Sequence, residues 1–435
     1  MIKISKGLDI PISGMPSNEV ENSAVRSVGV VASDYPGLKP TMMVNIGDTV
    51  RAGDKLFENK KNPGSFITSP GSGTIAEINR GEKRKFLSIS IDLDDSINPI
   101  QFDTTDPIKC LEESGYFAFF KTRPFNRVPI IGSKPTAIFV NACDTNPLAV
   151  SPNSIIKHEQ NNFDKGLNVI SNIFETDVPV FCSYVGEKPS PVSNINFKEF
   201  KGKHPAGLVG TQVHFTLPVS LKRQVWTIGY QEVIAIGHLF TTGNIKLDKY
   251  VSLGGEGVYE PKILKTNAGA NIDQLTAGKI KDNTRVIAGS VLNGIHAKDV
   301  MSYVGAFDNQ ISVLPDEAND ILFNWAMPGS KLHSQMGAFL SSWIKPKKFI
   351  FNTSINGGNR AIVPLPPYEE VMPLNILATQ LLKALVTKDI ELGVKLGVLE
   401  LAPEDLALSS YVCPSKYDYQ TILQENLDLI FEEMA

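Results

Sequence analysis

The most restrictive feature of the chain is a run of short, glycine-punctuated segments of β-type composition between residues 41 and 91. Gly-Asp pairs stand at Gly47-Asp48 and Gly53-Asp54, and such pairs favour tight turns. The segments between the turns alternate apolar and polar residues over stretches too short for helices. Short strands at this spacing predict a small β barrel or β sandwich.

The same region resembles the lipoyl/biotinyl carrier fold. The matching pattern is G-D-x-V-x-x-G-D-x-L over residues 47–56, followed by S-P-x-x-G-x-I over residues 69–75. Members of that family carry a prosthetic group on a lysine at a hairpin tip, and Lys60 and Lys61 stand near that place. The acidic residue before the lysine and the methionines of biotin carriers are absent, so we expect the fold without its prosthetic group. A carrier modified at Lys60 or Lys61 is the alternative.

Residues 71–76 match the glycine pattern of dinucleotide-binding loops, G-x-G-x-x-A. Such a loop has to follow a strand and open a helix, whose N-terminal N–H groups bind the pyrophosphate. Here Ser69-Pro70 precedes the glycines, and Thr74–Ile78 alternates apolar and polar residues as a strand does. We therefore interpret the string as a hairpin corner.

The middle of the chain predicts a parallel α/β sheet. Residues 136–140 and 178–182 have the composition of buried strands, and residues 159–175 between them place apolar side chains on one helical face. Short β segments return between residues 251 and 314. The last hundred residues are helical in pattern, most clearly at 374–386 and 419–431.

The spacing of the cysteines and histidines and the balance of charges exclude several classes of protein. The four cysteines form no C-x-x-C pair and the six histidines no H-E-x-x-H motif, so no metal site is expected. The chain has 42 basic and 46 acidic residues, and this balance argues against nucleic-acid binding. No apolar run approaches the ~20 residues that a membrane span requires. The N-terminal residues lack the pattern of an export signal, so we expect a soluble, cytoplasmic chain.

Taken in order, five strings resemble the A subunit of the bacterial sodium-translocating NADH:quinone oxidoreductases. The resemblance covers almost the whole length and rests on these segments: Lys6–Gly14 (KGLDIPISG), Leu56–Gly64 (LFENKKNPG), Ala142–Leu148 (ACDTNPL), His204–Phe215 (HPAGLVGTQVHF) and Val412–Lys416 (VCPSK). Where that family usually has Gly-Thr-His before the second His-Phe, this chain has Gln212. No role for a histidine at that position is carried over.

The resemblance implies an α/β multi-domain fold, similar to the C subunit of the Rnf complex and to the flavoprotein subunit of complex I. The expected domains are a lipoyl-like barrel-sandwich hybrid (1–100), a Rossmann-like α/β domain (108–250), a β-grasp module (251–330) and a C-terminal helical domain without an iron–sulfur cluster (331–435). In those relatives grouped cysteines hold clusters, whereas here Cys413 has no companion thiols.

The resemblance also implies a function. We expect a peripheral subunit on the cytoplasmic face of the bacterial inner membrane, which contributes to the reduction of ubiquinone coupled to Na⁺ export. Ubiquinone is the expected substrate, and NADH, flavins and iron–sulfur clusters are expected on partner subunits. The main expected partner is a membrane subunit. No complete active site is expected on this chain alone. A flavin-binding oxidoreductase using the α/β domain is a further alternative.

Candidate quinone-binding residues stand in three places. A quinone headgroup needs a flat apolar slot and a few hydrogen-bond donors, which the segment 117–127 supplies in Phe120, Arg123, Phe125 and Arg127. A core strand followed by a solvated basic loop explains this segment equally well.

Asn141 and Asp144 follow a predicted strand, where open α/β sheets bind ligands, although turn and capping chemistry favours the same residues. His204 and His214 bracket a glycine-rich stretch and could donate to a carbonyl oxygen or relay a proton. More often such histidines are hydrogen-bonded structural groups.

Overall fold

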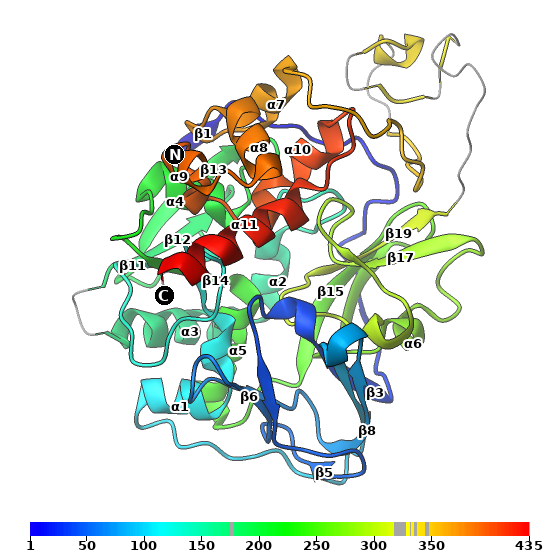
Figure 1. Ribbon diagram of the computed structural model, residues 1–435. Helices are drawn as coiled ribbons and strands as arrows, with labels where there is room; N and C mark the ends of the chain where they lie inside the picture. Colours follow the sequence, from blue (N-terminus) through cyan, green and yellow to red (C-terminus); the bar gives the residue numbers. More distant parts are fainter. Residues whose placement is uncertain (175–177, 317–327, 331, 335–336, 344–347, 435) are drawn as a thin grey trace.

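The computed structural model describes residues 1–174, 178–316, 328–330, 332–334, 337–343 and 348–434. Over these residues the strands form four sheets, and a separate group of helices ends the chain (Figure 1). No helix in this described part is long and apolar enough to cross a membrane.

Two small sheets face each other in the N-terminal domain, which we call the barrel, and confirm the predicted β sandwich. The strand orders are β3-β9-β8-β5 and β4-β6-β7. Inward side chains such as Leu56, Phe57 and Ile89 are fully buried between them. The strands are β3 (Ser27–Val31), β4 (Pro40–Met42), β5 (Thr49–Val50), β6 (Lys55–Asn59), β7 (Phe66–Thr68), β8 (Gly73–Arg80) and β9 (Phe86–Leu93), with short 3-10 turns η1 (Ala32–Asp34) and η2 (Glu82–Arg84).

The glycine string at residues 71–76 opens strand β8 rather than a helix, as predicted. Gly73 pairs with Leu93 of β9, and a Cβ atom at Gly73 would lie 1.9 Å from the carbonyl oxygen of Asp92. The close approach of two backbones therefore explains this glycine, without any phosphate ligand.

A six-stranded sheet forms the α/β domain, in the order β1-β13-β12-β11-β14-β10. All its neighbouring pairs are parallel except β10 with β14. Helices α3 and α5 pack on one face and α4 on the other, so β11 is apolar on both sides. The elements are β1 (Ile2–Ile4), α1 (Pro107–Glu113), η3 (Tyr116–Phe119), β10 (Lys121–Arg123), β11 (Ala137–Ala142), α2 (Pro152–His158), α3 (Gln160–Asn172), β12 (Val180–Tyr184), β13 (Asn196–Gly202), α4 (Val209–Thr216), β14 (Val225–Gly229) and α5 (Tyr230–Thr242).

A second six-stranded sheet follows, in the order β18-β17-β19-β15-β16-β2. Its core is a cluster of buried aliphatic residues beneath the short helix α6. The elements are β2 (Val20–Asn22), β15 (Asp248–Gly254), β16 (Lys262–Asn267), α6 (Ile272–Thr276), β17 (Thr284–Ala288), β18 (Ile295–His296), η5 (Asp299–Met301) and β19 (Gln310–Pro315).

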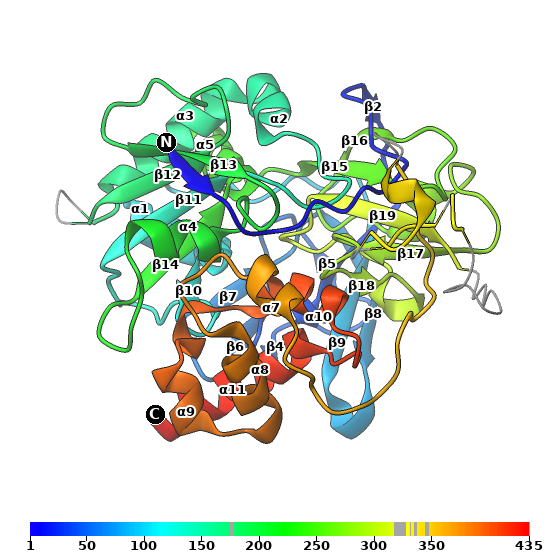
Figure 2. The ribbon, with the colours of Figure 1, turned by 90° about the horizontal axis from the view of Figure 1, so that it is seen from above.

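The first 22 residues contribute strands to two sheets that are otherwise built from much later parts of the chain. Strand β1 pairs in parallel with β13, and strand β2 pairs in parallel with β16. Figure 2 shows this N-terminal segment running along the α/β domain and on to the second large sheet. The N-terminal segment therefore ties these two domains together.

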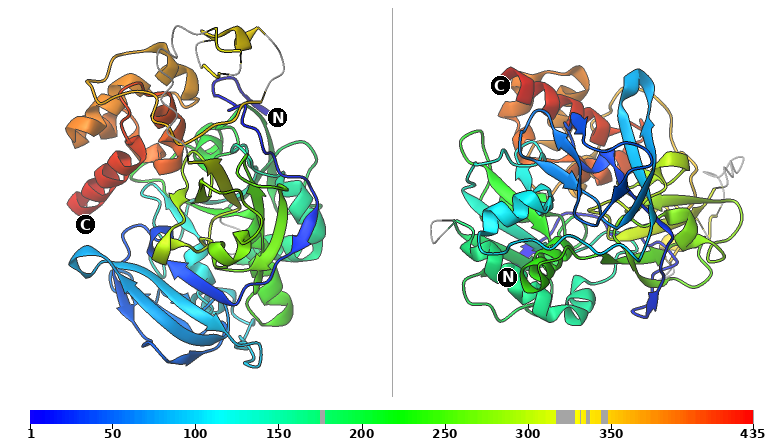
Figure 3. Two further views of the ribbon diagram at one scale, coloured as in Figure 1. Left: turned by 90° about the vertical axis from the view of Figure 1, so that its right-hand side faces the viewer. Right: turned by 90° about the horizontal axis from the view of Figure 1, so that it is seen from below.

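The C-terminal helices pack around a core of leucines and Tyr419, and both predicted helices are confirmed. Figures 2 and 3 show this group beside the α/β sheet and the barrel. The elements are η7 (Leu340–Ser342), α7 (Pro366–Val371), α8 (Ala378–Thr387), α9 (Ile390–Lys395), η8 (Val398–Glu400), η9 (Pro403–Leu406), α10 (Ala407–Val412) and α11 (Tyr419–Met434).

Candidate functional site

The candidate site is a cleft of about 360 Å³ at the carboxyl edge of the α/β sheet. The chain leaves β11 toward β12 and β13 on one side, then returns to β14 on the other side of β11. Neighbouring parallel strands whose connections run in opposite directions open a crevice at their carboxyl ends, where ligands of open α/β sheets bind. The residues that end β11 and β14, including Asn141, Ile228 and Gly229, line this cleft.

Every domain of the chain contributes to the wall of the cleft. Many of the lining residues belong to the α/β domain, and the second large sheet supplies aromatic side chains. Outside the α/β domain, the lining includes Ser33 and Asp34 of the barrel, Tyr303, Phe307 and Asp308 of the second large sheet, and Glu404 of η9. An aromatic wall facing a few polar groups suits a flat, partly polar ligand.

Hydrogen bonds hold the loop after β11 in place. Asn141 donates to the carbonyl oxygen of Gly207 at 3.0 Å, and its own side-chain oxygen accepts from Gln212 at 2.9 Å. Asp144 accepts from the backbone and the side chain of Asn146 at 2.9 and 3.0 Å. Burial of Asp144 outweighs these bonds and raises the pKa of the carboxyl group to about 6.

A second group of charges gathers where η1, β10 and the loop before β19 meet. Lys121 donates to the backbone oxygen of Asp34, and its ammonium group lies 4.1 Å from the centre of the Phe307 ring. A Cβ atom at Gly305 would lie 2.7 Å from carboxylate oxygens of both Asp34 and Asp308. The two carboxylates therefore face the same small space.

The pKa values of Asp34 and Lys121 are both shifted toward 7. Burial, and then the nearby Asp308 carboxylate, raise the pKa of Asp34 to about 7. Burial lowers the pKa of Lys121 to about 8, against the opposing attraction of Asp34. Burial also raises the pKa of Glu232. Groups with such values can gain and lose protons near neutral pH.

His204 lies behind the loop that carries Asp144. Its Nδ1 is 3.2 Å from the hydroxyl group of Thr145, and its backbone N–H donates to Asp9 at 2.9 Å. Burial lowers the pKa of His204 to about 4, so the ring is neutral at physiological pH. His204 therefore supports the loop of the cleft in its neutral form.

Residues 120–127 connect the α/β domain to the C-terminal helices. Phe120 is fully buried against Trp226, with ring centres 5.5 Å apart. The side chain of Arg123 is 1% exposed. Its two terminal guanidinium nitrogens pair with carboxylate oxygens of Asp405 and Glu404 in η9, each at 2.7 Å. This arrangement is a buried ionic contact between two domains.

Three further predicted residues lie at the same domain junction. Phe125 packs edge-on against Phe431, and Arg127 pairs with Asp428 at 2.5 Å. In His214, Nε2 accepts from the backbone N–H of Asn375, so the ring proton is on Nδ1, which lies 2.6 Å from Glu400.

The eight predicted residues thus separate into distinct environments. Asn141 and Asp144 line the cleft together, and His204 supports their loop. Phe120 lies in the α/β core. The remaining four, Arg123, Phe125, Arg127 and His214, contact the C-terminal helices.

Five charged residues of the cleft were not predicted: Asp34, Lys121, Glu232, Asp308 and Glu404. Lys121 belongs to the segment 117–127, so the excess of cations there was a usable signal. The other four come from four separate domains, and nothing in the local sequence around each of them indicates a shared site.

The turn that holds Lys60 and Lys61 is docked against neighbouring domains. Asn62 donates to the backbone oxygen of Pro129 at 2.8 Å and accepts from Ile131 at 3.0 Å. Lys61 lies 3.5 Å from Glu432 of α11. A swinging carrier lysine requires a free hairpin tip, and this turn does not provide one.

Among the described residues, no group of three or more histidine, cysteine or acidic side chains could hold a metal ion. All four cysteines are buried. The Sγ atom of Cys413 accepts a hydrogen bond from the hydroxyl group of Tyr368 at 3.1 Å.

Comparison with known proteins relates all three of the N-terminal, α/β and second large-sheet regions to one family. Three family models match: "NqrA N-terminal barrel-sandwich hybrid domain" over residues 2–94, "NqrA second alpha/beta domain" over 104–245 and "NQRA C-terminal domain" over 250–299. The chain is 44% identical over 447 aligned positions to the A subunit of the Na(+)-translocating NADH-quinone reductase of Neisseria meningitidis. It is 43% identical to the corresponding protein of Yersinia pseudotuberculosis. Each match covers the whole of both proteins.

Proposed function

This chain belongs to the family of A subunits of the Na(+)-translocating NADH-quinone reductases, and we propose that it contributes to ubiquinone reduction coupled to Na⁺ export in such a complex. The observation that carries the proposal is the end-to-end identity of 44% to a named member of that family. An identity of this size over every domain supports a shared place in the assembly. The chain acts as one subunit, and no complete active site is assigned to it.

The quinone headgroup binds in the cleft at the carboxyl edge of the α/β sheet. Aromatic side chains such as Phe307 and Tyr303 line this cleft together with the polar residues Asn141 and Asp144. These groups match the needs of a flat ring with two carbonyl oxygens. His204 keeps the loop of Asp144 in place, while Phe120, Arg123, Phe125, Arg127 and His214 stabilise the surrounding domains.

The fold types of the two large sheets are proposed from the same family membership. The sheet from β10 to β14 is Rossmann-like, which its strand order and its crevice at the β11–β14 switch support. The sheet from β15 to β19, under helix α6, is a β-grasp module. For the domain boundaries we keep the proposal made from the sequence, at residues 100, 108, 250 and 330, with strands β1 and β2 of the first segment pairing into the two later sheets.

The partners are the other subunits of the reductase. The relatives' name includes translocation of Na⁺, so a membrane subunit is the main partner of this chain, which sits on the cytoplasmic face as a peripheral subunit. NADH, flavins and iron–sulfur clusters belong to those other subunits. Ubiquinone is the one redox substrate that this chain contacts.

Photo-crosslinking of a quinone analogue to the intact complex tests the proposal. We expect labelled peptides from this chain that contain Asn141–Asn146 or residues 227–232, with labelling suppressed by excess ubiquinone. An Asp144→Asn variant should raise the KM for quinone more than it lowers kcat, because the group contacts the bound ring.

Labelling confined to partner subunits, or to residues of this chain outside the cleft, would contradict the assigned site. An Asp95→Asn variant is a suitable control, since this exposed residue lies in the turn after β9 and lines no part of the cleft.

A further inference from the structure

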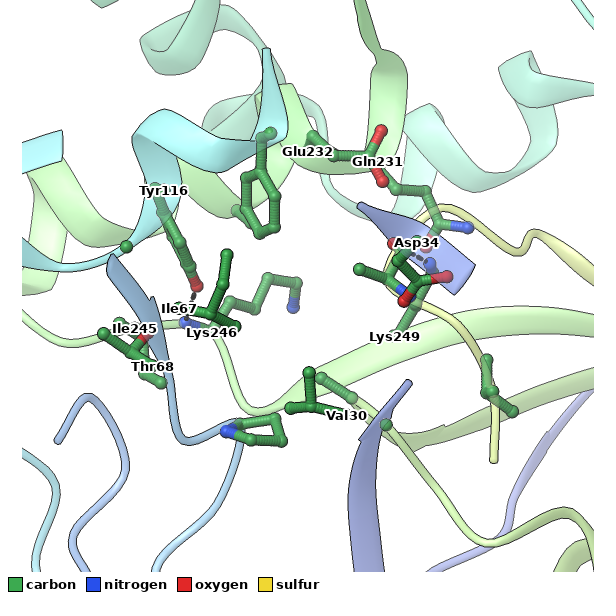
Figure 4. Close-up of a pocket in the computed structure, with 18 of the residues that line it drawn as sticks. Val30, Asp34, Ile67, Thr68, Tyr116, Gln231, Glu232, Ile245, Lys246 and Lys249 are labelled. Atoms are coloured by element: carbon green, nitrogen blue, oxygen red, sulfur yellow. Dashed lines mark hydrogen bonds between the residues drawn. The ribbon is translucent and has the colours of Figure 1, made fainter. Parts of the chain in front are cut away.

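A smaller cavity of about 110 Å³ lies beside the cleft, where the barrel, helix α5 and strand β15 meet (Figure 4). We call it the inner cavity. Three residues line both the inner cavity and the cleft: Asp34, Phe119 and Glu232. Glu232 is buried and Asp34 is half-buried. The wall between the two spaces therefore carries two carboxyl groups.

The lining of the inner cavity also includes a charged group that is partly exposed to solvent, Asp248. Lys246 is 2.8 Å from Asp248 and 3.1 Å from Glu159. Asp248 also pairs with Lys265 at 3.3 Å, and its side chain is 36% exposed. Figure 4 shows Lys246 across the cavity from Asp34 and Glu232. Titratable groups thus stand at both ends of this space.

The inner cavity is large enough to hold several water molecules, and the polar groups within its mainly apolar lining could hydrogen-bond them. Besides the charged groups, Gln231 and the tyrosines Tyr116 and Tyr250 line it. A water-filled space between titratable groups allows protons to pass by short transfers.

The charges that face the two carboxyl groups come from several elements. Asp34 faces Lys121 of β10, Lys249 of β15 and Asp308 from the loop before β19. Glu232 faces the same two lysines. Because two cations stand beside these acids, either protonation state of each carboxyl group is electrostatically tolerated.

We propose that Asp34 and Glu232 form the last step of a proton path that runs from solvent at Asp248, through the inner cavity, to the cleft. The inference rests on the proposed function, in which quinone is reduced in the cleft. Quinone takes up two electrons, which NADH supplies through the reductase, and two protons, to give quinol. Each carboxyl group donates one proton to this reaction, directly or through water, and is reprotonated from the inner cavity.

Glu232 has a structural role that the test must separate from proton transfer. It is the third residue of α5, and the backbone N–H groups of Gly229 and Glu232 face its carboxylate. A glutamine keeps an oxygen that can accept these bonds but cannot donate a carboxylic proton. Glu232→Gln therefore preserves the helix start and removes the proton path.

The experiment compares Glu232→Gln and Asp34→Asn in the intact reductase complex. We expect quinone reduction to fall by about 10- to 100-fold, with a loss that deepens as pH rises, because delivery then depends on hydronium. The solvent deuterium isotope effect should increase, and added formate should restore part of the rate as a small proton donor. NADH oxidation by ferricyanide, which takes up no protons, reports whether electron entry on the partner subunits is unchanged, and co-purification of the variant chain with those subunits reports whether the complex is intact.

Glu112→Gln is the matched control, because this half-buried glutamate on α1 lines neither space. Variants that match the control in rate, pH profile and isotope effect would overturn the proton path. A lowered rate with an unchanged pH profile and no response to formate would also overturn it, since a structural defect gives that result.

Photo-crosslinking separates this inference from the function on which it rests. If the quinone analogue labels the cleft of the parent complex and of Glu232→Gln equally, the variant rates test the proton path alone. If the parent complex shows no label in the cleft, the assigned quinone site fails, and the proton path fails with it.

Discussion

Two groups of charges join the domains of this chain, and they are built differently. At the junction with the C-terminal helices, Arg123 is held by Asp405 and Glu404 at 2.7 Å each. At the cleft, Asp34, Lys121, Glu232 and Asp308 line open space, and Lys121 bonds a backbone oxygen. We refer to these groups as the Arg123 junction and the cleft cluster.

The charges of the Arg123 junction stabilise the fold, whereas those of the cleft cluster can take part in proton transfer. In the Arg123 junction, opposite charges meet at hydrogen-bond distance, and these contacts hold two domains together. In the cleft cluster, burial moves the pKa values of Asp34 and Lys121 to about 7 and about 8. Such groups exchange protons at physiological pH and are suited to a reaction that consumes them.

The largest effect is expected at the Arg123 junction. Arg123→Ala leaves the 2%-exposed side chain of Asp405 as a buried charge without its cation, and should cost about 3–5 kcal/mol of unfolding free energy. Urea unfolding of the full chain measures this. Lys157→Ala, which removes an exposed pair with Glu187, is the control and should leave the midpoint unchanged. Equal urea midpoints for the two variants would show that the Arg123 junction does not stabilise the contact between the domains.

The next effect concerns the pH dependence of the cleft cluster. The folded pKa of Asp34, about 7, is above its ordinary value of 3.8, so the folded state holds the extra proton between these values. Asp34 should therefore contribute a loss of up to about 4 kcal/mol of stability as pH rises from 4 to 7, and Asp34→Asn should remove this contribution from the profile. Urea midpoints across that range check it. Parallel pH profiles for parent and variant would contradict the assignment.

His204 should show the opposite pH dependence. Its folded pKa of about 4 is below the ordinary 6.5, so the unfolded state binds the extra proton between these values. The buried neutral ring should contribute a loss of about 3 kcal/mol of stability as pH falls from 6.5 to 4, opposite in sign to the contribution of Asp34. His204→Asn should flatten this part of the profile, whereas a substitution of the exposed His296 should leave it in place.

The smallest effect is expected at Arg127, on the rim of the junction. Its partner Asp428 is 41% exposed, so the ion pair is screened, although the guanidinium group also covers the Phe431 ring at 4.0 Å. Arg127→Ala should cost about 1 kcal/mol, and less in high salt. Lys388→Ala, which removes a more exposed pair to the same helix, should cost less. A larger loss than for Arg123→Ala would reverse the ranking of the two contacts.

Much of the fold was readable from local sequence. The turn pairs Gly47-Asp48 and Gly53-Asp54 predicted the β sandwich, and the apolar faces of α3 and α11 predicted their helices. Asn141 and Asp144 were found because the carboxyl end of a predicted strand is itself a local signal. These features depend on spacing within one segment.

The role of residues 120–127 could not be predicted from the local sequence. Cations and aromatic rings side by side suit a ligand slot and a domain contact equally. Only the position of η9 and α11, some 280 to 300 residues later, shows Arg123 and Arg127 pairing with carboxylates of this chain. Composition tells which groups are present, but not what they face.

The sequence by itself determined the family, the β sandwich, the α/β sheet and the helical C-terminal region, because glycine turns and apolar periodicity act over a few residues. Only the tertiary structure decided that β1 and β2 join distant sheets and that Asp34, Lys121, Glu232 and Asp308 meet at one cleft. Their pKa shifts are likewise tertiary properties, since burial and neighbouring charges exist only once the domains have packed.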